Sequence, residues 1–385
     1  MDKKLLLNPV IICGADTVGR VLFDVCKEIG LNVVGFADYK PSLTGTMFCG
    51  LKVYYTPNMP KKFKDATYLI SVMTIRDVVE TLHSQGIDNL IAGGSLLGRI
   101  DTAQTSYLLN DEKYQVESCR ISHNAFMKKY YVFLRSIDIM ITERCSLRCR
   151  DCSNLMQYFE RPRNYQIDDL NMSVYSLLKY TDEIMEARIL GGDTFMHPEW
   201  ARMVAWVGCF SKIGRVIVYT NGVIIPKDIS ILSHPKVIVY LTDYGKLSKN
   251  LNKLVSLFEE SRVRYKIVKI DEWLDCSSIY KHNRTAEQND KLFQECIATN
   301  LITLTDGKVF RCPYAASAFQ LKAVENIKTD YVDVYGLTNK KTLNDYITSR
   351  KAMSICDYCT SRILDNKVTP AVQIKEPLKY KRVRT

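Results

Sequence analysis

Residues 142–156 read T-E-R-C-S-L-R-C-R-D-C-S-N-L-M, with cysteines at positions 145, 149 and 152 in the spacing C-x3-C-x2-C. A short apolar run at 137–141, interrupted only by Asp138, precedes them and predicts a strand that leads into this loop. Clustered thiolates select zinc, copper(I) or iron–sulfur. Structural zinc and iron–sulfur cubes normally take four ligands, and this loop offers three. A four-iron cube held here would have one open iron. The alternatives are a zinc loop with a distant fourth ligand, or three unrelated thiols.

Residues 136–290 alternate strand and helix patterns. Strands are expected at 137–142, 187–190, 215–220, 237–242 and 265–270, and helices near 170–186, 198–210 and 246–260. Repeated βα units of this length predict a partial or full parallel barrel, in which functional residues lie at the carboxyl ends of strands. The three-cysteine loop directly follows the first of these strands.

The next strand ends also carry polar or glycine-rich turns: Gly191-Gly192-Asp193, then Thr220-Asn221-Gly222, then Asp243. Two glycines at a strand end expose backbone carbonyls, and a carboxylate suits an ammonium group. Asn221 and Asp243 are candidates for contacts with a cofactor or substrate, although either side chain could instead cap a turn or helix.

A second cysteine set follows in residues 291–365. Asp306-Gly307 between two β-rich runs predicts a hairpin. The set makes a closed four-ligand site, for which zinc and a [4Fe–4S] cluster are both possible from the residues alone; its members are Cys296, Cys312, Cys356 and Cys359. Cys209 and Cys276 remain unassigned, and Cys276 is kept with Asp243 as a candidate catalytic residue.

Taken together, the three-cysteine loop, the Gly-Gly-Asp strand end and the second cysteine set resemble the radical S-adenosylmethionine (radical SAM) superfamily, specifically its SPASM/twitch group. The resemblance covers roughly residues 136–362. It implies a partial (β/α)6 barrel over 136–290 and a twitch-like auxiliary cluster domain over 291–365. In this family, Gly-Gly-Glu binds the methionine moiety of S-adenosylmethionine; here Asp193 replaces the glutamate.

The resemblance also implies cofactors and a reaction. Two [4Fe–4S] clusters are expected, the first on Cys145, Cys149 and Cys152 and the auxiliary one on the second set. S-adenosylmethionine would be bound by Gly191, Gly192, Asp193 and Asn221 and cleaved reductively, and the resulting radical would take a hydrogen atom from a substrate carbon. The family commonly has an aromatic residue just before the third cysteine, near the adenine. Asp151 stands there in this chain, so adenine packing must come from elsewhere.

Residues 1–95 predict a small Rossmann-like α/β domain. The glycine fingerprint is incomplete, since Gly14 and Gly19 match but Asp16 replaces the middle glycine, where a carboxylate would oppose a pyrophosphate. Asp38 is placed to reach a ribose. The domain resembles N-terminal domains of nucleotide-sugar-modifying enzymes in bacterial surface-polysaccharide pathways; docking or dimerisation is the alternative role. Residues 96–135 are expected to be a connector, in which Cys119 and a surface His123 lie four apart.

The expected activity is therefore oxidation or epimerisation of a nucleotide-linked sugar. The enzyme alternative is a radical SAM maturase that modifies a peptide, and the non-enzyme alternative is a binding protein stabilised by zinc. A net charge of +11 suits an anionic partner, such as a phosphorylated substrate or an acidic electron donor like flavodoxin. Nucleic acid and membrane are not expected as partners. Thirteen cysteines clustered at short spacings without a secretory signal indicate a reducing, cytoplasmic location. Residues 366–385 are expected to form a flexible basic tail.

Overall fold

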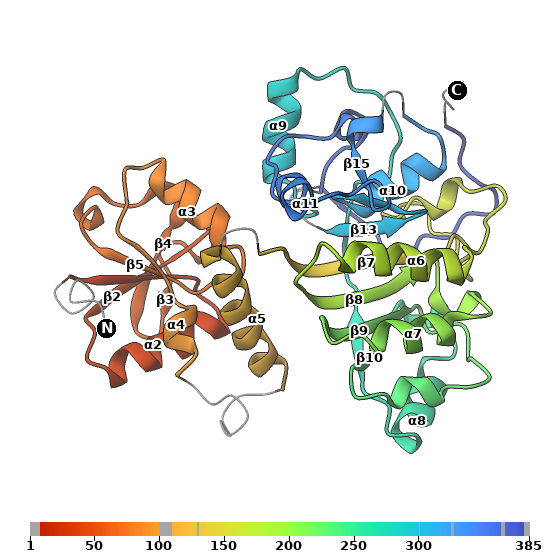
Figure 1. Cartoon of the computed structure of the whole chain (residues 1–385), viewed down its shortest axis with the longest axis horizontal. Helices are drawn as coiled ribbons and strands as arrows, with labels where there is room; N and C mark the ends of the chain where they lie inside the picture. Colours follow the sequence, from red (N-terminus) through yellow and green to blue (C-terminus); the bar gives the residue numbers. More distant parts are fainter. Residues whose placement is uncertain are drawn as a thin grey trace. The chain divides into compact units, whose positions relative to one another are not determined.

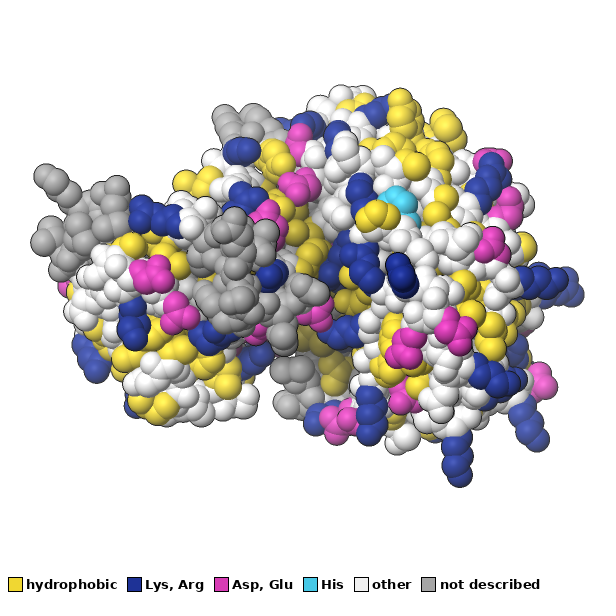
Figure 2. All heavy atoms as spheres, turned by 90° about the horizontal axis from the view of Figure 1, so that it is seen from below, with side chains coloured by type: hydrophobic (Ala, Val, Ile, Leu, Met, Phe, Trp, Pro, Cys, Tyr) yellow, Lys and Arg dark blue, Asp and Glu magenta, His cyan; other side chains and the backbone are white. Residues whose placement is uncertain are grey.

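The computed structural model describes residues 8–99, 110–128, 131–299, 301–324, 327–362 and 366–380. The chain divides into two compact units, residues 1–131 and 132–385. Figure 1 traces both units. In the described residues no helix is long and apolar enough to span a membrane. Figure 2 shows lysine and arginine side chains scattered among other residue types on the face in view, rather than gathered into one continuous patch.

The first unit is built on one six-stranded sheet in the order β3-β4-β2-β1-β5-β6, in which all neighbours except β3 and β4 run parallel. A parallel sheet of this kind agrees with the expected α/β class, and β3 is added as an antiparallel edge. Its strands are β1 (Val10–Cys13), β2 (Val33–Asp38), β3 (Met47–Phe48), β4 (Leu51–Tyr55), β5 (Thr67–Ile70) and β6 (Leu90–Ala92).

Helices cover both faces of this sheet. They are α2 (Thr17–Glu28), α3 (Ile75–His83), α4 (Gly94–Leu97) and α5 (Asn110–Met127), with short 3-10 turns η1 (Pro41–Leu43), η2 (Thr56–Asn58) and η3 (Lys61–Phe63). Successive residues of β1 point to opposite faces: Val10 and Ile12 pack with α2, α4 and α5, whereas Ile11 and Cys13 pack with α3.

The predicted connector over 96–135 is wrong for the part that the structure describes. Leu96 and Leu97 of α4, and Val116 and Cys119 of α5, belong to the buried core of the first unit. The connector therefore completes this domain, and the boundary lies between residues 131 and 132. Long polar stretches in this segment concealed a helix whose buried positions are few.

The second unit is built on an eight-stranded sheet in the order β11-β10-β9-β8-β7-β13-β14-β15. Its first five strands in chain order run parallel, and β13 joins the other edge of β7, also in parallel. The strands of this unit are β7 (Phe133–Thr142), β8 (Glu183–Gly191), β9 (Ile213–Thr220), β10 (Val237–Asp243), β11 (Tyr265–Lys269), β12 (Trp273–Leu274), β13 (Ile302–Thr305), β14 (Lys308–Phe310), β15 (Tyr331–Asp333) and β16 (Lys367–Val368).

One face of the parallel strands packs against three helices, as Figure 1 shows for α6, α7 and α8. Alternate residues such as Ile137, Ile139 and Ile141 of β7 enter this core, so the intervening residues lie on the opposite face. The helices of the unit are α6 (Ile167–Leu178), α7 (Trp200–Gly208), α8 (Leu251–Glu260), α9 (Ala286–Glu295), α10 (Pro313–Gln320) and α11 (Lys340–Ile347); the 3-10 turns are η4 (Met156–Tyr158), η5 (Thr194–Met196), η6 (Ser230–Ser233), η7 (Gly245–Leu247), η8 (Ile327–Thr329) and η9 (Ser354–Tyr358).

The expected sixth barrel strand does not follow β11 in the described residues. The next strand in the chain, β12, pairs antiparallel with β16, so β7–β11 are five consecutive parallel strands, and the sixth parallel strand, β13, lies beside β7 instead. The predicted hairpin is confirmed: β13 and β14 pair antiparallel around Asp306 and Gly307, both of which have positive φ (44° and 69°). Positive φ at both central residues is the mark of a type I′ turn.

The predicted flexible tail is wrong for residues 366–380. The Asp275 amide donates to the Asn366 carbonyl at 2.8 Å, the Leu378 amide donates to the Gln157 carbonyl at 2.9 Å, and the Tyr380 hydroxyl donates to the Leu321 carbonyl at 2.7 Å. The basic residues Arg382 and Arg384 lie outside the described residues. Charge alone suggested a solvated tail, but the apolar and amide side chains between the charges bind this segment to the second unit.

Candidate metal centres

The three-cysteine loop begins at the carboxyl end of β7. Hydrogen bonds at both ends of the loop hold it in place. The buried carboxylate of Glu143 accepts a bond from the Tyr165 hydroxyl at 2.9 Å and one from the Arg163 amide at 3.0 Å. Asn154 donates from its side chain to the Gly191 carbonyl at 3.3 Å. The loop is thus bound to the chain that follows it and to the end of β8.

The end of β8 lies against the loop so closely that only glycine fits there. The Gly192 amide donates to the Thr142 carbonyl and the Asp193 amide to the Arg144 carbonyl, both at 2.9 Å. A Cβ atom on Gly191 would stand 2.0 Å from the Thr142 oxygen, and one on Gly192 would stand 2.1 Å from the Arg144 oxygen. Gly191 also has a φ of 154°, which disfavours other residues. The Gly-Gly pair therefore sets the distance between cysteine loop and strand end.

Asp193 is almost fully buried and its carboxylate is already bonded within the chain. Oδ1 accepts from the Phe195 amide at 3.0 Å, Oδ2 accepts from the Asn221 amide at 2.8 Å, and the Thr220 hydroxyl lies within 3.2 Å of both oxygens. Burial raises the pKa of this carboxyl group, and these donors oppose the shift. Asp193 joins the ends of β8 and β9, and it caps η5.

Asn221, at the end of β9, connects that strand to the first cysteine. Its Nδ2 donates to the Ser146 hydroxyl at 3.1 Å and lies 3.5 Å from the Cys145 sulfur, while its Oδ1 accepts from the Val223 amide. The predicted cofactor residues Gly191, Gly192, Asp193 and Asn221 thus surround the three-cysteine loop. Asp243 does not share these contacts, because its Oδ1 accepts from the Gly245 amide and stabilises its own turn.

Burial raises the pKa of all three thiols, that of Cys149 to about 11. N–H groups oppose the shift: the Leu147 amide at Cys145, the Gln373 side chain at Cys149, and the Asn154 and Met156 amides at Cys152. Buried sulfurs that receive N–H bonds suit thiolates whose charge a metal would neutralise. The chemistry of this donor set fits a bound iron–sulfur cluster.

Tyr244, which follows β10, was not singled out from the sequence. Burial raises the pKa of its hydroxyl, and the nearby Cys152, Cys149, Cys145 and Asp193 raise it further, so the ring lies close to the cysteine loop. Its ring also meets Trp273 edge-on at a centroid distance of 5.7 Å. Its position directly after the end of β10, next to the candidate residue Asp243, was the available signal.

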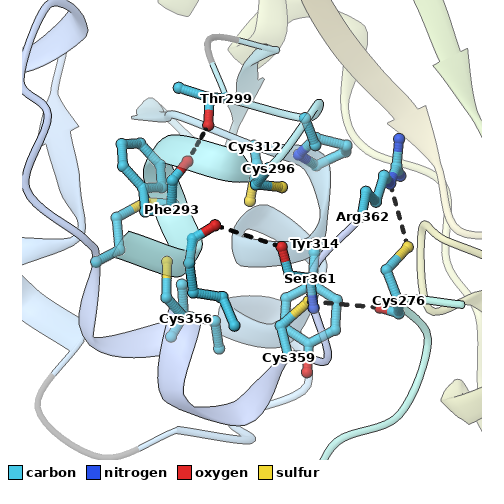
Figure 3. A pocket seen from close by; sticks show the side chains of 15 residues that line it. Cys276, Phe293, Cys296, Thr299, Cys312, Tyr314, Cys356, Cys359, Ser361 and Arg362 are labelled. Carbon is cyan, nitrogen blue, oxygen red and sulfur yellow. Dashed lines mark hydrogen bonds between the residues drawn. The ribbon is translucent and has the colours of Figure 1, made fainter. Parts of the chain in front are cut away.

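The second cysteine set lines a small apolar cavity of about 40 Å³. Figure 3 shows Cys296, Cys312, Cys356 and Cys359 around it, contributed by chain segments that are far apart in sequence. Cys312 caps α10 and accepts from the Ala315 amide at 3.4 Å, and Cys359 accepts from the Ser361 amide at 3.2 Å. Burial raises the pKa of the Cys312 thiol to about 12. The four predicted cysteines are therefore brought together at one cavity.

Cys276 is a fifth cysteine in the wall of this cavity. It is buried, and its sulfur accepts a bond from Nε of Arg362 at 3.1 Å, as Figure 3 shows. Arg362 also interacts electrostatically with Cys152 of the first loop and with Asp138 of β7. One guanidinium group thus lies within electrostatic range of both cysteine sets. Cys209, in contrast, is exposed at the end of α7.

In the described part of the chain, no three side chains of His, Cys, Asp or Glu converge in the arrangement of a single bound ion. A tetrahedral zinc site would need its thiolates within about 4 Å of one another, given a Zn–S distance of about 2.3 Å. In a four-iron cube each thiolate binds a different iron atom, so the sulfurs stand further apart.

A charged network lies on the face of the sheet opposite α6–α8. Asp138 of β7 stands beside Arg188 of β8 in the strand register, and Glu186 stands beside Arg215 of β9. Glu186 accepts from Arg188 at 2.6 Å and from Arg215 at 2.8 Å. Asp138 Oδ1 is buried with no hydrogen-bond partner, and its distance to Arg188 Nη1 is 3.9 Å. The one polar residue in the apolar run 137–141 was the signal for this site.

In the first unit, the turn after β1 is closed by its own carboxylates. Asp16 caps α2 by accepting from the Gly19 amide at 3.0 Å, where a Rossmann domain would receive a phosphate. Asp38 accepts from the Ala15 amide at 2.9 Å and from the Lys40 amide at 2.8 Å. Asp38, the predicted ribose contact, and Asp16, the residue expected to oppose a pyrophosphate, are thus both engaged within the chain.

The expectation of a surface histidine at position 123 is wrong, because only 1% of His123 is exposed. Its Nδ1 accepts from the Gly94 amide at 2.9 Å, and its Nε2 donates to the Val72 carbonyl at 2.8 Å. Cys119 donates to the Ser71 carbonyl at 3.2 Å. With both ring nitrogens bonded in this way, the pair joins α5 to β5 and α4 and leaves no open ligand position.

No protein-family model and no curated protein sequence matches this chain. Among solved structures, SuiB of Streptococcus suis bound to S-adenosylmethionine is 14% identical, with a TM-score of 0.32 over 57% of this chain. The aligned part spans 49% of the SuiB chain, about half its length. BtrN in complex with AdoMet and 2-DOIA is 17% identical, with a TM-score of 0.38 over 64% of this chain and 98% of that one. Identity and TM-score are both low, so the similarity identifies no function for this chain.

Proposed function

We propose that this chain is a radical SAM enzyme with two iron–sulfur clusters. The observation that carries the proposal is the joining of three strand ends: the cysteine loop after β7 is hydrogen-bonded to Gly192 and Asp193 of the β8 end, and Asn221 at the β9 end contacts Cys145. Cys145, Cys149 and Cys152 would hold the first cluster and leave one iron open. When bound there with S-adenosylmethionine, that cluster supplies the electron that makes a 5′-deoxyadenosyl radical.

Different residues of the chain would contact different parts of S-adenosylmethionine. The backbone of Gly191 and Gly192 offers carbonyl groups beside the loop for the ammonium group. Asp193 holds β8 and β9 in register through Thr220 and Asn221, and its negative charge favours a cation nearby. Tyr244 supplies the aromatic surface for the adenine, in place of the residue at position 151. Asp151, which occupies that position in this chain, forms a salt bridge with Arg150 at 2.9 Å.

The second cysteine set would hold the auxiliary cluster. Cys296, Cys312, Cys356 and Cys359 provide a closed set of four thiolates around one cavity, and Arg362 provides a positive charge beside it. The small volume of this cavity leaves no room beside the cluster for a substrate. Cys276 and Arg362 would lie between it and the face of the sheet that carries the charged network.

The substrate would bind on the face of β7 and β8 that carries the charged network. Asp138 Oδ1 is the unpartnered acceptor there, and a substrate hydroxyl would complete its bonding. Arg188, Arg362 and Arg135 act on its charge, and Arg215 bonds to Glu186. The arginines therefore outnumber the carboxylates Asp138 and Glu186 and favour an anionic group. A phosphorylated or nucleotide-linked sugar has both a hydroxyl group and an anionic group. The reaction would be oxidation or epimerisation of one of its carbinol carbons.

The test is anaerobic reconstitution of the full chain followed by metal analysis. Two four-iron cubes predict about eight irons per chain. Replacing Cys145, Cys149 and Cys152 by Ala should remove about half, whereas Cys209→Ala, an exposed thiol outside both sets, should remove none. With S-adenosylmethionine and a reductant, the wild type should form 5′-deoxyadenosine and the triple variant should not.

A panel of nucleotide sugars read by mass spectrometry then tests the substrate class. Stoichiometric zinc without iron in the anaerobically isolated protein would refute the radical SAM proposal. A mass change in a peptide and in no sugar would leave the cluster chemistry in place and refute the sugar.

A further inference from the structure

The segment around Gln373 pairs with the three-cysteine loop as a short antiparallel strand. The Arg150 amide donates to the Val372 carbonyl at 2.7 Å, and the Ile374 amide donates to the Arg148 carbonyl at 2.9 Å. Cys149 and Gln373 stand opposite each other as a β-bridge between these two bonds. The middle cysteine of the loop is therefore held from the other end of the unit's sequence, more than 200 residues away.

The side-chain amide of Gln373 completes this contact. Nε2 donates to the Cys149 sulfur at 3.1 Å and to the Ala371 carbonyl at 2.8 Å, and Oε1 accepts from the Arg148 amide at 2.9 Å. Rotating the amide by half a turn would place oxygen against the Ala371 oxygen and nitrogen against the Arg148 N–H group. The network thus assigns the orientation in which an N–H group faces sulfur.

The segment is fastened on both sides of Gln373. Before it, β16 pairs with β12 through Val368 and Trp273. After it, the Leu378 amide bonds to Gln157, and the Tyr380 ring meets Tyr158 edge-on at a centroid distance of 5.6 Å. Because its backbone is held at these points, Gln373 keeps its place beside Cys149 although much of its surface is exposed.

We propose that Gln373 is a positioning residue of the first metal site, which fixes Cys149 and donates an N–H bond to its sulfur. The inference rests on the cluster proposed above. An N–H bond stabilises negative charge on sulfur, and a reduced cluster carries one more negative charge than an oxidised one. Gln373 therefore favours the reduced form and raises the midpoint potential of the first cluster. It also strengthens retention of that cluster, since outer-shell partners of metal ligands commonly contribute about 10–100-fold in affinity.

Two variants of the full chain separate these effects. Gln373→Leu removes the donor and the acceptor at nearly constant size. Gln373→Glu keeps an acceptor for the Arg148 amide but removes the donor to Cys149. Glu376→Gln is the matched control, because it lies three residues further along and its loss of negative charge can move the potential only upward. Far-UV circular dichroism and tryptophan fluorescence establish that all variants are folded.

The readouts are a redox titration followed by electron paramagnetic resonance without S-adenosylmethionine, and competition with an iron chelator. In both Gln373 variants one of the two clusters should shift to a more negative potential and bind iron about 10–100-fold more weakly. That cluster should be the one lost in Cys149→Ala, and complete loss of its iron in the Gln373 variants supports the proposal equally. An unchanged potential and affinity in Gln373→Leu would overturn the role of Gln373 while leaving the enzyme proposal intact. Failure of the wild type to bind iron would overturn both.

Discussion

At the scale of single residues, two buried aspartates on neighbouring strands have opposite surroundings. Asp193 accepts hydrogen bonds on both oxygens from groups of its own chain, so it serves the structure around the loop. Asp138 has one oxygen with no partner, and burial raises the pKa of this carboxyl group to about 6 in spite of Arg188 and Arg362. An acceptor left unpaired in the interior costs free energy, which selection tolerates most readily at functional sites.

Asp138→Asn should therefore stabilise the fold, and more so as pH rises. The folded-state pKa is raised from 3.8 to about 6, so ionisation of Asp138 destabilises the folded chain between these values and by a constant amount above them. The gain from the amide should grow by about 1.5 kcal/mol between pH 5 and pH 8. Urea unfolding followed by tryptophan fluorescence measures it, because Trp200, Trp206 and Trp273 all lie in the second unit.

Asp243→Asn is the control for Asp138→Asn, since its carboxylate lies in a partly exposed turn. It shows the effect of removing a carboxylate charge from that turn. If the difference in unfolding free energy between Asp138→Asn and the wild type stayed constant from pH 5 to pH 8, the Asp138 carboxylate would be compensated within the chain. Asp138 would then no longer be part of the proposed substrate site. With substrate, the same variant should still cleave S-adenosylmethionine but lose product.

At the scale of elements, the β13–β14 hairpin determines where Cys312 stands. The turn places Asp306 and Gly307 at positive φ, and Cys312 lies two residues after the end of β14 as the cap of α10. A Cβ atom on Gly307 would also stand 2.5 Å from the Tyr335 ring. The hairpin therefore needs glycine for its backbone and for the space that Tyr335 occupies.

Gly307→Ala should destabilise the second unit by about 1–2 kcal/mol, the usual cost of a side chain in left-handed backbone. It should also weaken iron retention at the second cysteine set and leave the first set unchanged. Gly336→Ala is matched to it, because its nearest contact would be an ordinary 3.7 Å and its φ is not in the left-handed region. Equal effects of the two variants on iron would show that the hairpin does not position Cys312.

The elements that could be predicted from sequence are those that carry local signals. A dipeptide turn signal between β-rich runs sufficed for the β13–β14 hairpin, and cysteine spacing sufficed for the cysteines that line the cavity. Sequence patterns did not predict contacts between residues that lie far apart in the chain. Gln373 faces Cys149 from more than 200 residues away, and β13 joins β7 rather than continuing after β11. Neither contact leaves a local pattern in the sequence.

At the scale of the whole molecule, each unit has a hydrophobic core of its own. In the first, residues 96–119 contribute Leu96, Leu97, Val116 and Cys119 to the core around α2, with exposures of 5%, 1%, 1% and 0%. Complete burial of a leucine or valine side chain stabilises the fold by about 1.5–3 kcal/mol. The summed contribution of these side chains is comparable to the free energy of unfolding of a whole domain, which is roughly 5–15 kcal/mol.

The first unit therefore needs α5 in order to fold. A fragment of residues 1–131 should unfold cooperatively, whereas a fragment of residues 1–95 should not, because it lacks α5 and the end of α4. Circular dichroism during urea titration measures both, with Val116→Ala in the longer fragment as an intermediate case. Cooperative unfolding of 1–95 would show that α4 and α5 are accessory after all.

The longer fragment also tests the nucleotide question by calorimetry. It should not bind NAD, because the Asp16 carboxylate already accepts the Gly19 amide and its charge repels a pyrophosphate. A nucleotide sugar such as UDP-glucose should bind weakly, with its phosphates away from this turn. Tight binding of NAD would refute the role of Asp16. Binding of neither nucleotide would leave docking or dimerisation as the role of the first unit and would assign recognition of an anionic substrate to Arg188, Arg215 and Arg362 of the second.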